Sequence, residues 1–393
     1  MQTANEITYL DNNATTALDP VVLETMLPWL QSSGYGNPSS PYSIGKKARK
    51  AVETAREQVV SLLNASASEI LFTSCGTESI NAAILAACNY DPDRRHVITS
   101  AVEHSATLKL CEHLARRGYQ ITYLPVDSEG RLSAADVQKA ITDETALVTL
   151  LWANNETGVL FPIEEIAAVC QAEKVPLHLD AVQAVGKIPI DVEALGVSML
   201  SLSGHKLHAP KGIGALYVNK RFRFIPLLRG SQENERRGGT ENVASIVALG
   251  KSSELAKVHF TDEQERVRAL RDRFENAILK NIPDTRVNGS TEFRLPNTSN
   301  IHFDGVESEG VLMLLDDAGI CCSAGSACTT GSVTPSHVLT AMGKTPTEAR
   351  SSLRFSFGRL NTESHVDHAI ATLPAVIEKL RTLNPAGQVV IQA

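Results

Sequence analysis

Between residues 46 and 220 the sequence alternates short apolar runs with amphipathic segments of helical length, and this pattern constrains the fold more than any other feature. Near-continuous apolar strands that alternate with helices are typical of βαβ units, which build a mostly parallel sheet covered by helices on both faces. Ligands of such sheets bind beyond the carboxyl ends of the strands. A site is therefore expected directly after the runs of strand character, which are residues 69–74, 96–100, 120–126, 146–153, 176–181, 198–204 and 214–218.

The rest of the chain predicts a second, smaller unit. Residues 261–280 have the pattern of a long bridging helix, with Thr261 and Gln264 as a capping box at its start. Strand and helix candidates follow at residues 299–305, 319–323, 352–358 and 365–383. A chain of 393 residues is long for one hydrophobic core, so we expect two domains. The predicted large domain spans residues 15–260, and the small α/β domain combines residues 1–14 with 261–393.

Composition narrows the class of protein. A formal net charge of −7 and a pI near 5.9 argue against nucleic acid or an anionic membrane as the main partner. The first residues lack the basic and apolar regions of a signal peptide, and no apolar run approaches the roughly 20 residues of a membrane span. Seven cysteines, an odd number with no C-x-x-C pair, suit a reducing compartment and argue against a structural zinc site. We therefore expect a cytoplasmic protein.

Two of the expected strands end near residues whose side chains could take part in a reaction. Asp180 lies at the end of the run 176–181, with Gln183 just beyond it, and Lys206 follows the next run, 198–204. A buried acid costs free energy unless a cation meets it, although an N-cap or a salt bridge is the commoner explanation. A lysine after a strand is ordinarily a surface residue. Together, however, an acid for a pyridinium nitrogen and a lysine for a Schiff base are the two groups that pyridoxal phosphate requires.

A phosphate group also needs donors, and the run 69–74 supplies a candidate. It passes through small residues into a helix that begins near Gly76 and Thr77, where backbone amides and the helix dipole favour an anion. A threonine at a helix start is, by itself, most often only a cap. His104, just past the run 96–100, is either a structural or exposed histidine or a ring stacked on a cofactor. The residues alone leave these alternatives open.

The motifs taken together resemble a known family. They are "YLDNNATT", "FTSCGTES", "WANNETG", "HLDAVQAVGK", "SLSGHKLHAPKGIGALY", "RRGGTEN", "GSACTTG", "PSHVL" and "SLRFSFGRLNT". In this order and spacing they are similar to the pyridoxal-phosphate-dependent cysteine desulfurases of the NifS/IscS type, within the class V aminotransferases. The resemblance extends from about residue 7 to past residue 360. It implies the PLP-dependent transferase fold type I: a large domain with a mostly parallel seven-stranded sheet, plus a smaller α/β domain.

The resemblance also implies roles for individual residues. Lys206 would form the Schiff base and move the Cα proton, whereas its competitor Lys211 would be backbone support or surface. Asp180 would keep the pyridine nitrogen protonated, and His104 would stack on the ring and shuttle protons. The implied contacts to the phenolic oxygen come from Gln183 and Asn155; those to the phosphate come from Gly76, Thr77, Ser203, His205 and, across a homodimer interface, Thr240.

Arg354 would bind the carboxylate of the substrate L-cysteine, with Asn155 beside it. A guanidinium forks onto a carboxylate in a geometry that lysine cannot reproduce. Without the family match, an exposed strand arginine is the ordinary explanation of Arg354. The sequence does not assign the chain to one branch of this family. The stretch "RRGGTENV" resembles nitrogen-fixation members somewhat more than housekeeping ones.

Cys328 lies in a segment of small residues, about 322–335, that has little surface to bury. The resemblance implies that its thiolate attacks the substrate sulfur and becomes a persulfide, which it then carries to an acceptor. A nucleophile that visits two places suits a mobile loop, and its pKa has to be lowered at least transiently. The persulfide of Cys328 is also a candidate ligand for a transient iron–sulfur cluster. We expect Cys321 and Cys322 to be core packing.

Several other functions are compatible with parts of this pattern. The same scaffold serves selenocysteine lyases, aminotransferases and kynureninase-like hydrolases, but an aminotransferase has no use for Cys328. A non-catalytic scaffold would not need Lys206, Asp180, His104 and Cys328 together. A metal site built from Cys321, Cys322 and Cys328 lacks the spacing and the histidines that zinc usually takes. The sulfur acceptor, whether a scaffold for iron–sulfur clusters or another acceptor protein, cannot be read from the sequence.

Overall fold

A seven-stranded sheet forms the centre of the molecule. The computed structural model describes residues 7–32, 34–324 and 334–383. The strands lie in the order β2-β8-β7-β6-β5-β3-β4, and β8 runs antiparallel to both neighbours while the other pairings are parallel. They are β2 (Ile70–Thr73), β3 (His96–Ser100), β4 (Gln120–Leu124), β5 (Thr145–Leu151), β6 (Leu177–Asp180), β7 (Met199–Ser203) and β8 (Gly214–Val218). All seven predicted runs are strands of this sheet, and the prediction of a mostly parallel α/β fold is confirmed.

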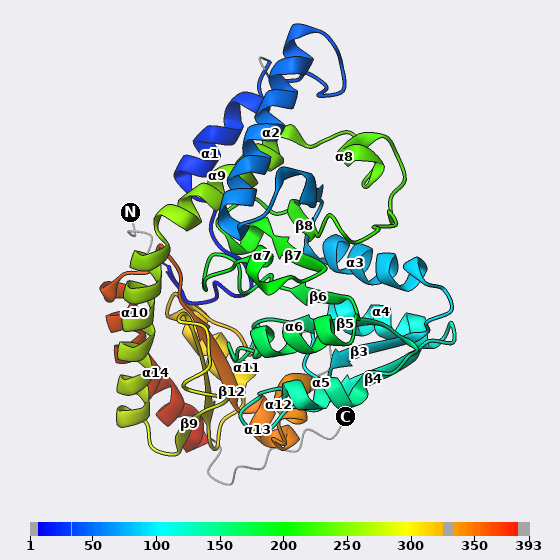
Figure 1. Cartoon of the computed structure of the whole chain (residues 1–393). Helices are drawn as coiled ribbons and strands as arrows, with labels where there is room; N and C mark the ends of the chain where they lie inside the picture. The colour runs from blue at the N-terminus through cyan, green and yellow to red at the C-terminus, as the bar shows by residue number, and fades with distance from the viewer. Residues whose placement is uncertain (1–6, 33, 325–333, 384–393) are drawn as a thin grey trace.

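Helices cover both faces of the sheet (Figure 1). One face packs against α3 (Gly76–Tyr90) and α4 (Ser105–Ala115), in a core that includes Ile80, Leu110 and Met199. The other face packs against a larger set of helices, in a core that includes Val52 and Ile246. These helices are α2 (Ser43–Leu63), α5 (Ala134–Ala140), α6 (Ile163–Ala172), α7 (Val192–Leu195) and α9 (Val243–Val258). Shorter elements of this part are α1 (Pro20–Met26), η1 (Leu27–Trp29), η2 (Ala67–Glu69), η3 (Gly204–Lys206) and α8 (Gln232–Glu235).

A second hydrophobic core lies around Phe274, Phe303 and Phe355. It is built on an antiparallel sheet of order β12-β10-β9 and on a parallel pair, β1 with β11. Leu10, just after β1, packs in the same core, so the N-terminal strand lies with the C-terminal elements. The elements are β1 (Thr8–Tyr9), α10 (Phe260–Asn281), β9 (Thr285–Val287), β10 (Thr298–Phe303), α11 (Ser308–Asp317), β11 (Ile320–Cys321), α12 (His337–Ala341), α13 (Pro346–Arg350), β12 (Ser352–Ser356) and α14 (Glu363–Leu383). The domain boundaries given above stay a prediction.

The capping box expected at the start of the long helix is wrong. α10 begins at Phe260, one residue earlier than predicted, and its cap position is His259 without a side-chain hydrogen bond. The side chain of Gln264 instead donates to the backbone oxygen of Lys187, at 2.7 Å. Gln264 fits the capping pattern in the sequence, but its side-chain amide makes a tertiary contact and does not cap the helix.

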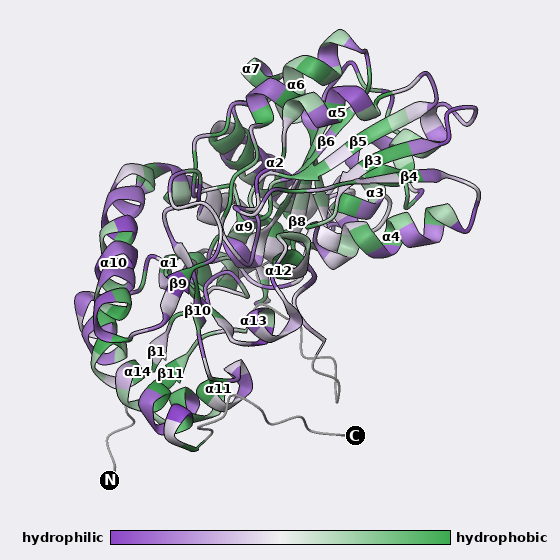
Figure 2. Ribbon diagram, turned by 90° about the horizontal axis from the view of Figure 1, so that it is seen from below, coloured by the Kyte–Doolittle hydropathy of each residue, from purple (hydrophilic) through white to green (hydrophobic). Residues whose placement is uncertain are grey.

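Hydropathy follows the layers. Figure 2 shows hydrophobic strands of the central sheet between helices, and a largely hydrophilic α10 at the periphery. Within the described ranges, none of the helices is both long and apolar enough to cross a membrane.

Candidate active site

A cavity of about 370 Å³ lies where the carboxyl ends of β5, β6 and β7 meet the start of α3. The N-terminal segment and β12 close it from the other side. Its walls include residues that the sequence placed at strand ends together with residues that the resemblance implied. These are Gly76, Thr77, His104, Asn155, Asp180, Gln183, Ser203, His205, Lys206 and Arg354. Chain segments far apart in the sequence therefore bring these side chains to one place.

Lys206 ends the short helix η3 directly after β7. Its Nζ donates to the backbone oxygens of Asn13, at 2.5 Å, and Ala14, at 2.7 Å. Burial lowers the pKa of Lys206 to about 8, with a further contribution from the Arg354 cation, whereas Asp11 and Asp180 act in the opposite direction. An amine with such a pKa is deprotonated far more often at neutral pH than an exposed lysine, so it is prepared for attack on a carbonyl carbon.

Asp180 is the last residue of β6 and is only 6% exposed. Its Oδ1 accepts a hydrogen bond from the backbone nitrogen of Val182 at 3.0 Å. Burial raises the pKa of Asp180, while His104 and Lys206 act against that rise. In the part of the chain that the structure describes, this carboxyl forms no ion pair. A buried acid that lacks a cationic partner fits the protonated ring nitrogen of a pyridine cofactor.

The start of α3 makes close contact with the ends of β6 and β7. A Cβ atom on Gly76 would lie 2.9 Å from Cγ2 of Val182 and 3.3 Å from Cβ of Ser203. Only a residue without a side chain lets the first turn of this 15-residue helix approach so closely. The hydroxyl-bearing Ser203 and the backbone amides at the start of α3 are the kind of donor set that a phosphate group takes. The residues present thus fit both ends of pyridoxal phosphate.

Histidines flank this donor set. His205 lies 3.2 Å from Oγ1 of Thr15 through its Nδ1, and burial lowers its pKa to about 4, so its imidazole is neutral. His104 is exposed in this chain and is the N-cap of α4, where its Nδ1 accepts a hydrogen bond from the nitrogen of Ala106 at 3.2 Å. The ordinary capping role and the position on the cavity wall therefore coexist in one residue.

Arg354 lies on β12 with its side chain 5% exposed. Its Nη1 donates to the backbone oxygen of Asn155 at 2.9 Å, and its Nη2 is 2.7 Å from Oδ1 of Asp11. Its Nε is buried and has no hydrogen-bond partner among the described residues. Arg354 lines the cavity, and a guanidinium in such a wall is suited to an incoming carboxylate.

Sequence reasoning missed Asn13, which is 1% exposed and joins both halves of the site. Its backbone oxygen accepts from Nε2 of Gln183 at 2.9 Å, and its Nδ2 donates to the backbone oxygen of Asn155 at 3.1 Å and to Oγ1 of Thr298 at 2.9 Å. It also missed Asp11 and Lys187. Asp11 and Asn13 stand in the quoted stretch "YLDNNATT", but they follow no long apolar run, so the strand-end rule gave no reason to single them out.

One of the predicted site residues lies elsewhere, and another is outside the described residues. Thr240 lines a different cavity of about 190 Å³, together with Arg237 and Glu241. Cys328 lies outside the described residues. Its neighbours Cys321 and Cys322 are partly buried free thiols, and burial raises the pKa of both. In the described part of the chain no three histidine, cysteine or acidic side chains gather as a metal site would need.

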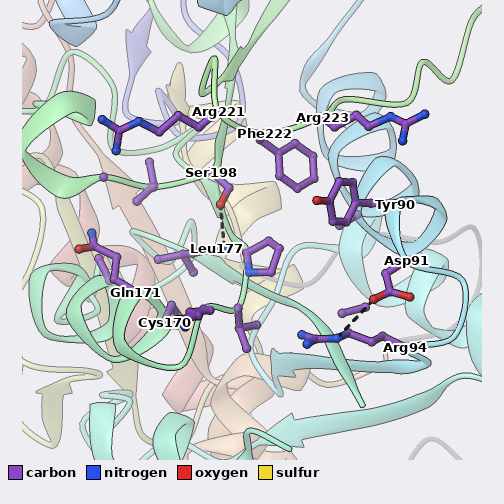
Figure 3. A pocket seen from close by; sticks show the side chains of 18 residues that line it. Tyr90, Asp91, Arg94, Cys170, Gln171, Leu177, Ser198, Arg221, Phe222 and Arg223 are labelled. Carbon is purple, nitrogen blue, oxygen red and sulfur yellow. Dashed lines mark hydrogen bonds and ion pairs between the residues drawn. The ribbon is translucent and has the colours of Figure 1, made fainter. Parts of the chain in front are cut away.

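A further cavity of about 370 Å³ lies at the opposite ends of the strands (Figure 3). Tyr90 and Phe222 stand on its wall with ring centroids 5.6 Å apart, near the ion pair of Arg94 with Asp91. Leu177, the first residue of β6, also lines it. None of the predicted site residues that the structure describes lines this cavity.

Known structures resemble this fold closely. A structure described as a NifS-like protein matches with a TM-score of 0.89 and 34% sequence identity, over 95% of this chain and 100% of that one. A structure described as SspA in complex with cysteine matches with a TM-score of 0.79 and 38% identity, over 90% of this chain and 99% of the other. Fold and cavity together define an enzyme of the NifS-like, pyridoxal-phosphate-dependent class.

Sequence comparison gives the family. The model of the aminotransferase class-V family matches residues 8–368, and the chain belongs to this family. A protein of Nostoc sp. named cysteine desulfurase is 52% identical over 380 residues, which are 96% of this chain and 95% of that protein. A protein of Azotobacter vinelandii named cysteine desulfurase NifS is 50% identical over 379 residues, which are 96% of this chain and 94% of that protein. The predictions of family, fold class and pyridoxal phosphate as cofactor are confirmed.

Proposed function

We propose that this chain is a cysteine desulfurase, which converts L-cysteine to L-alanine and passes the sulfur to an acceptor from a persulfide on Cys328. The observation that carries the proposal is the juxtaposition of Asp180, Lys206 and Arg354 around one cavity. Relatives about half identical over nearly the whole chain, and named for this activity, support it.

The cofactor is held at both ends by residues of this chain. When bound, pyridoxal 5′-phosphate supplies an electron sink that makes the bonds at the substrate Cα and Cβ labile. Asp180 would keep a proton on the ring nitrogen, and His104 would stack on the ring. Gln183 and Asn155 would donate toward the phenolic oxygen. The phosphate donors are Gly76, Thr77, Ser203, His205 and, from the partner subunit of a homodimer, Thr240.

The substrate is oriented by its carboxylate. Arg354 binds it through the guanidinium, with Asn155 beside it. Lys206, whose pKa is lowered to about 8 by burial, then accepts the Cα proton and returns it to carbon as alanine forms.

Cys328 collects the sulfur. Its thiolate attacks the substrate sulfur, so that an S–S bond forms as the Cβ–S bond breaks. The electron pair of the broken bond remains on the substrate carbon, which takes up a proton to become the methyl group of alanine. The atoms balance: one thiol and one cysteine give one persulfide and one alanine, without an external oxidant or reductant.

The persulfide then goes to an acceptor protein in the cytoplasm. A scaffold for iron–sulfur clusters is the acceptor that we propose, of housekeeping or nitrogen-fixation type, and the persulfide of Cys328 is the group that would meet iron there. The position of Thr240 on a separate cavity of its own chain supports a homodimer in which this residue serves the partner's site.

Mass spectrometry of the purified enzyme after exposure to L-cysteine tests the proposal. We expect 32 Da, the mass of one sulfur atom, to be added to the peptide that contains Cys328, with alanine formed in step. In Cys328→Ser both should be lost while the visible band of the cofactor remains, and Cys321→Ser is the matched control that keeps both. Added mass on Cys321 or Cys322 alone, or continued alanine formation in Cys328→Ser, would contradict the placement of the nucleophile.

A further inference from the structure

Lys187 is a partly buried lysine whose amine has no carboxylate partner in the described structure. It belongs to the turn that follows β6, and its Nζ donates to Oε1 of Gln183 at 2.6 Å and to Oδ1 of Asn13 at 3.1 Å. The acceptors are two neutral amides. Among the described residues, no carboxylate oxygen lies within ion-pair distance of the Lys187 amine. Burial lowers the pKa of Lys187 to about 7, with contributions from Lys206 and Arg354 in the same direction and from Glu263 against it. Burying an amine without a carboxylate partner costs free energy, so a function of Lys187 is expected to compensate for that cost.

Donor and acceptor chemistry supplies that reason. In its protonated form the Lys187 amine has only hydrogens to offer, so it donates to the oxygen of the Gln183 amide and repels its NH2 group. At the other end of the same amide, Nε2 donates to the backbone oxygen of Asn13 at 2.9 Å. A flipped amide would face an ammonium with its NH2 group and a carbonyl with its oxygen. The orientation of Gln183 is therefore fixed from both ends, and the second hydrogen of its NH2 group remains available on the cavity wall.

Hydrogen bonds from outside the central sheet hold Lys187 and its partner Asn13 in place. Its backbone oxygen accepts from Nε2 of Gln264 on α10, at 2.7 Å. The oxygen of Asn13 that it contacts is also bound by Nδ2 of Asn297, at 3.0 Å. Lys187 thus connects Gln183 to elements that pack outside the central sheet. It also lines a small cavity of about 40 Å³ together with Lys206.

We propose that Lys187 is a positioning residue that orients Gln183, so that this amide presents N–H and not oxygen to the phenolic oxygen of the cofactor. The inference rests on the proposed function, because the contact of Gln183 with the cofactor belongs to that proposal. A hydrogen bond donated to an oxygen favours its anionic form, so Gln183 in this orientation lowers the pH at which the bound cofactor changes its visible absorbance. Lys187 acts on the cofactor through Gln183.

The test is a pH titration of the visible absorbance of the purified enzyme with its cofactor. Lys187→Met should raise the midpoint by about 0.5–1 unit, the equivalent of one ordinary hydrogen bond. Gln183→Ala should raise it by a similar amount. The double variant should shift no further than Gln183→Ala alone, because the second change removes a brace from a side chain that is already gone. Lys139→Met, at an exposed lysine on α5, is the matched control and should leave the midpoint unchanged.

This double-mutant cycle of Lys187 and Gln183 separates the orientation of the Gln183 amide from other effects of the lysine. If Lys187→Met still raises the midpoint when Gln183 is alanine, its charge acts directly and the inference is overturned. An unchanged midpoint in Lys187→Met also overturns it, while leaving the proposed function intact. If the methionine variant does not fold, Lys187→Arg keeps a donor-only cation and should titrate within about 0.2 unit of the parent; a shift as large as that of Gln183→Ala contradicts the inference. A parent enzyme without a cofactor band overturns the proposed function itself.

Discussion

The two ends of the central sheet carry cavities of the same volume, about 370 Å³, but they differ in how their charges are held. At the carboxyl end, Asp180 is 6% exposed, and the side chain of Arg354 is 5% exposed. At the amino end, Arg221 and Arg223 extend from an exposed segment, and the Arg94–Asp91 pair is about 40% exposed on both sides, at 3.5 Å. The difference shows that volume does not distinguish a chemical site from a recess on this surface, whereas desolvated charge does.

The cause lies in the direction of the strands. The carboxyl ends of β5, β6 and β7 turn inward beneath the N-terminal segment and β12, so the polar residues that follow them are covered. The amino ends begin at surface turns. Residues placed at the two ends are therefore expected to respond differently to substitution.

Lys206→Ala should have the largest effect. Loss of the amine that we propose to hold the cofactor and move the proton should reduce alanine formation by roughly 10⁴-fold or more. The visible band of the covalently held cofactor should disappear as well. Lys211→Ala is the matched control, because Lys211 is an exposed lysine five positions away, and it should stay within about two-fold of the parent. Retention of the band in Lys206→Ala would show that another amine holds the cofactor.

Arg354→Lys comes next. A lysine keeps the charge but not the fork, and it cannot reach Asn155, Asp11 and a substrate carboxylate together. We expect kcat/KM for L-cysteine to fall about 10²- to 10³-fold, mostly through a higher KM. Steady-state assays of alanine formation measure both terms. A normal KM with a reduced kcat would indicate that Arg354 positions the catalytic groups and does not bind the carboxylate.

The third prediction concerns β6, the strand that runs between the two ends of the sheet. His178 is fully buried on β6, with Nδ1 2.8 Å from Oγ1 of Thr149 and Nε2 2.8 Å from Oγ of Ser201, and burial lowers its pKa to about 3. Because an unfolded histidine titrates near 6.5, the unfolded state binds more protons between about pH 6.5 and 3. Stability due to His178 is therefore present above pH 6.5 and is lost progressively toward pH 3.

At pH 5 this loss amounts to about 2 kcal/mol. Denaturant unfolding at pH 7 and pH 5 measures it. The pH dependence should be reduced by that amount in His178→Gln, which keeps hydrogen-bonding groups but does not titrate. An equal pH dependence in parent and variant would mean that other groups, such as His208, whose pKa burial also lowers to about 4, set the acid limit.

Much of the carboxyl end could be predicted from the sequence, because its residues follow long apolar runs. Asp180 and Lys206 stand at the ends of such runs, and the rule for parallel sheets brings those ends together. Arg354 needed the family resemblance, since a strand arginine carries no signal of its own. Lys187 and Asn13 could not be found from the sequence, because their importance arises from hydrogen bonds between segments 174 positions apart. The capping motif at Gln264 was misread for the same reason.

The amino end should show the smallest effects. Arg221→Ala and Arg223→Ala remove cations from an exposed segment, and neither side chain forms an ion pair in the described structure. Each variant should form alanine from L-cysteine within about two-fold of the parent and unfold within about 0.5 kcal/mol of it. Activity assays and urea unfolding on the same preparations measure the two quantities. A tenfold loss of activity in either would show that the cavity at the amino end takes part in the reaction, and exposure would no longer separate the two ends of the sheet.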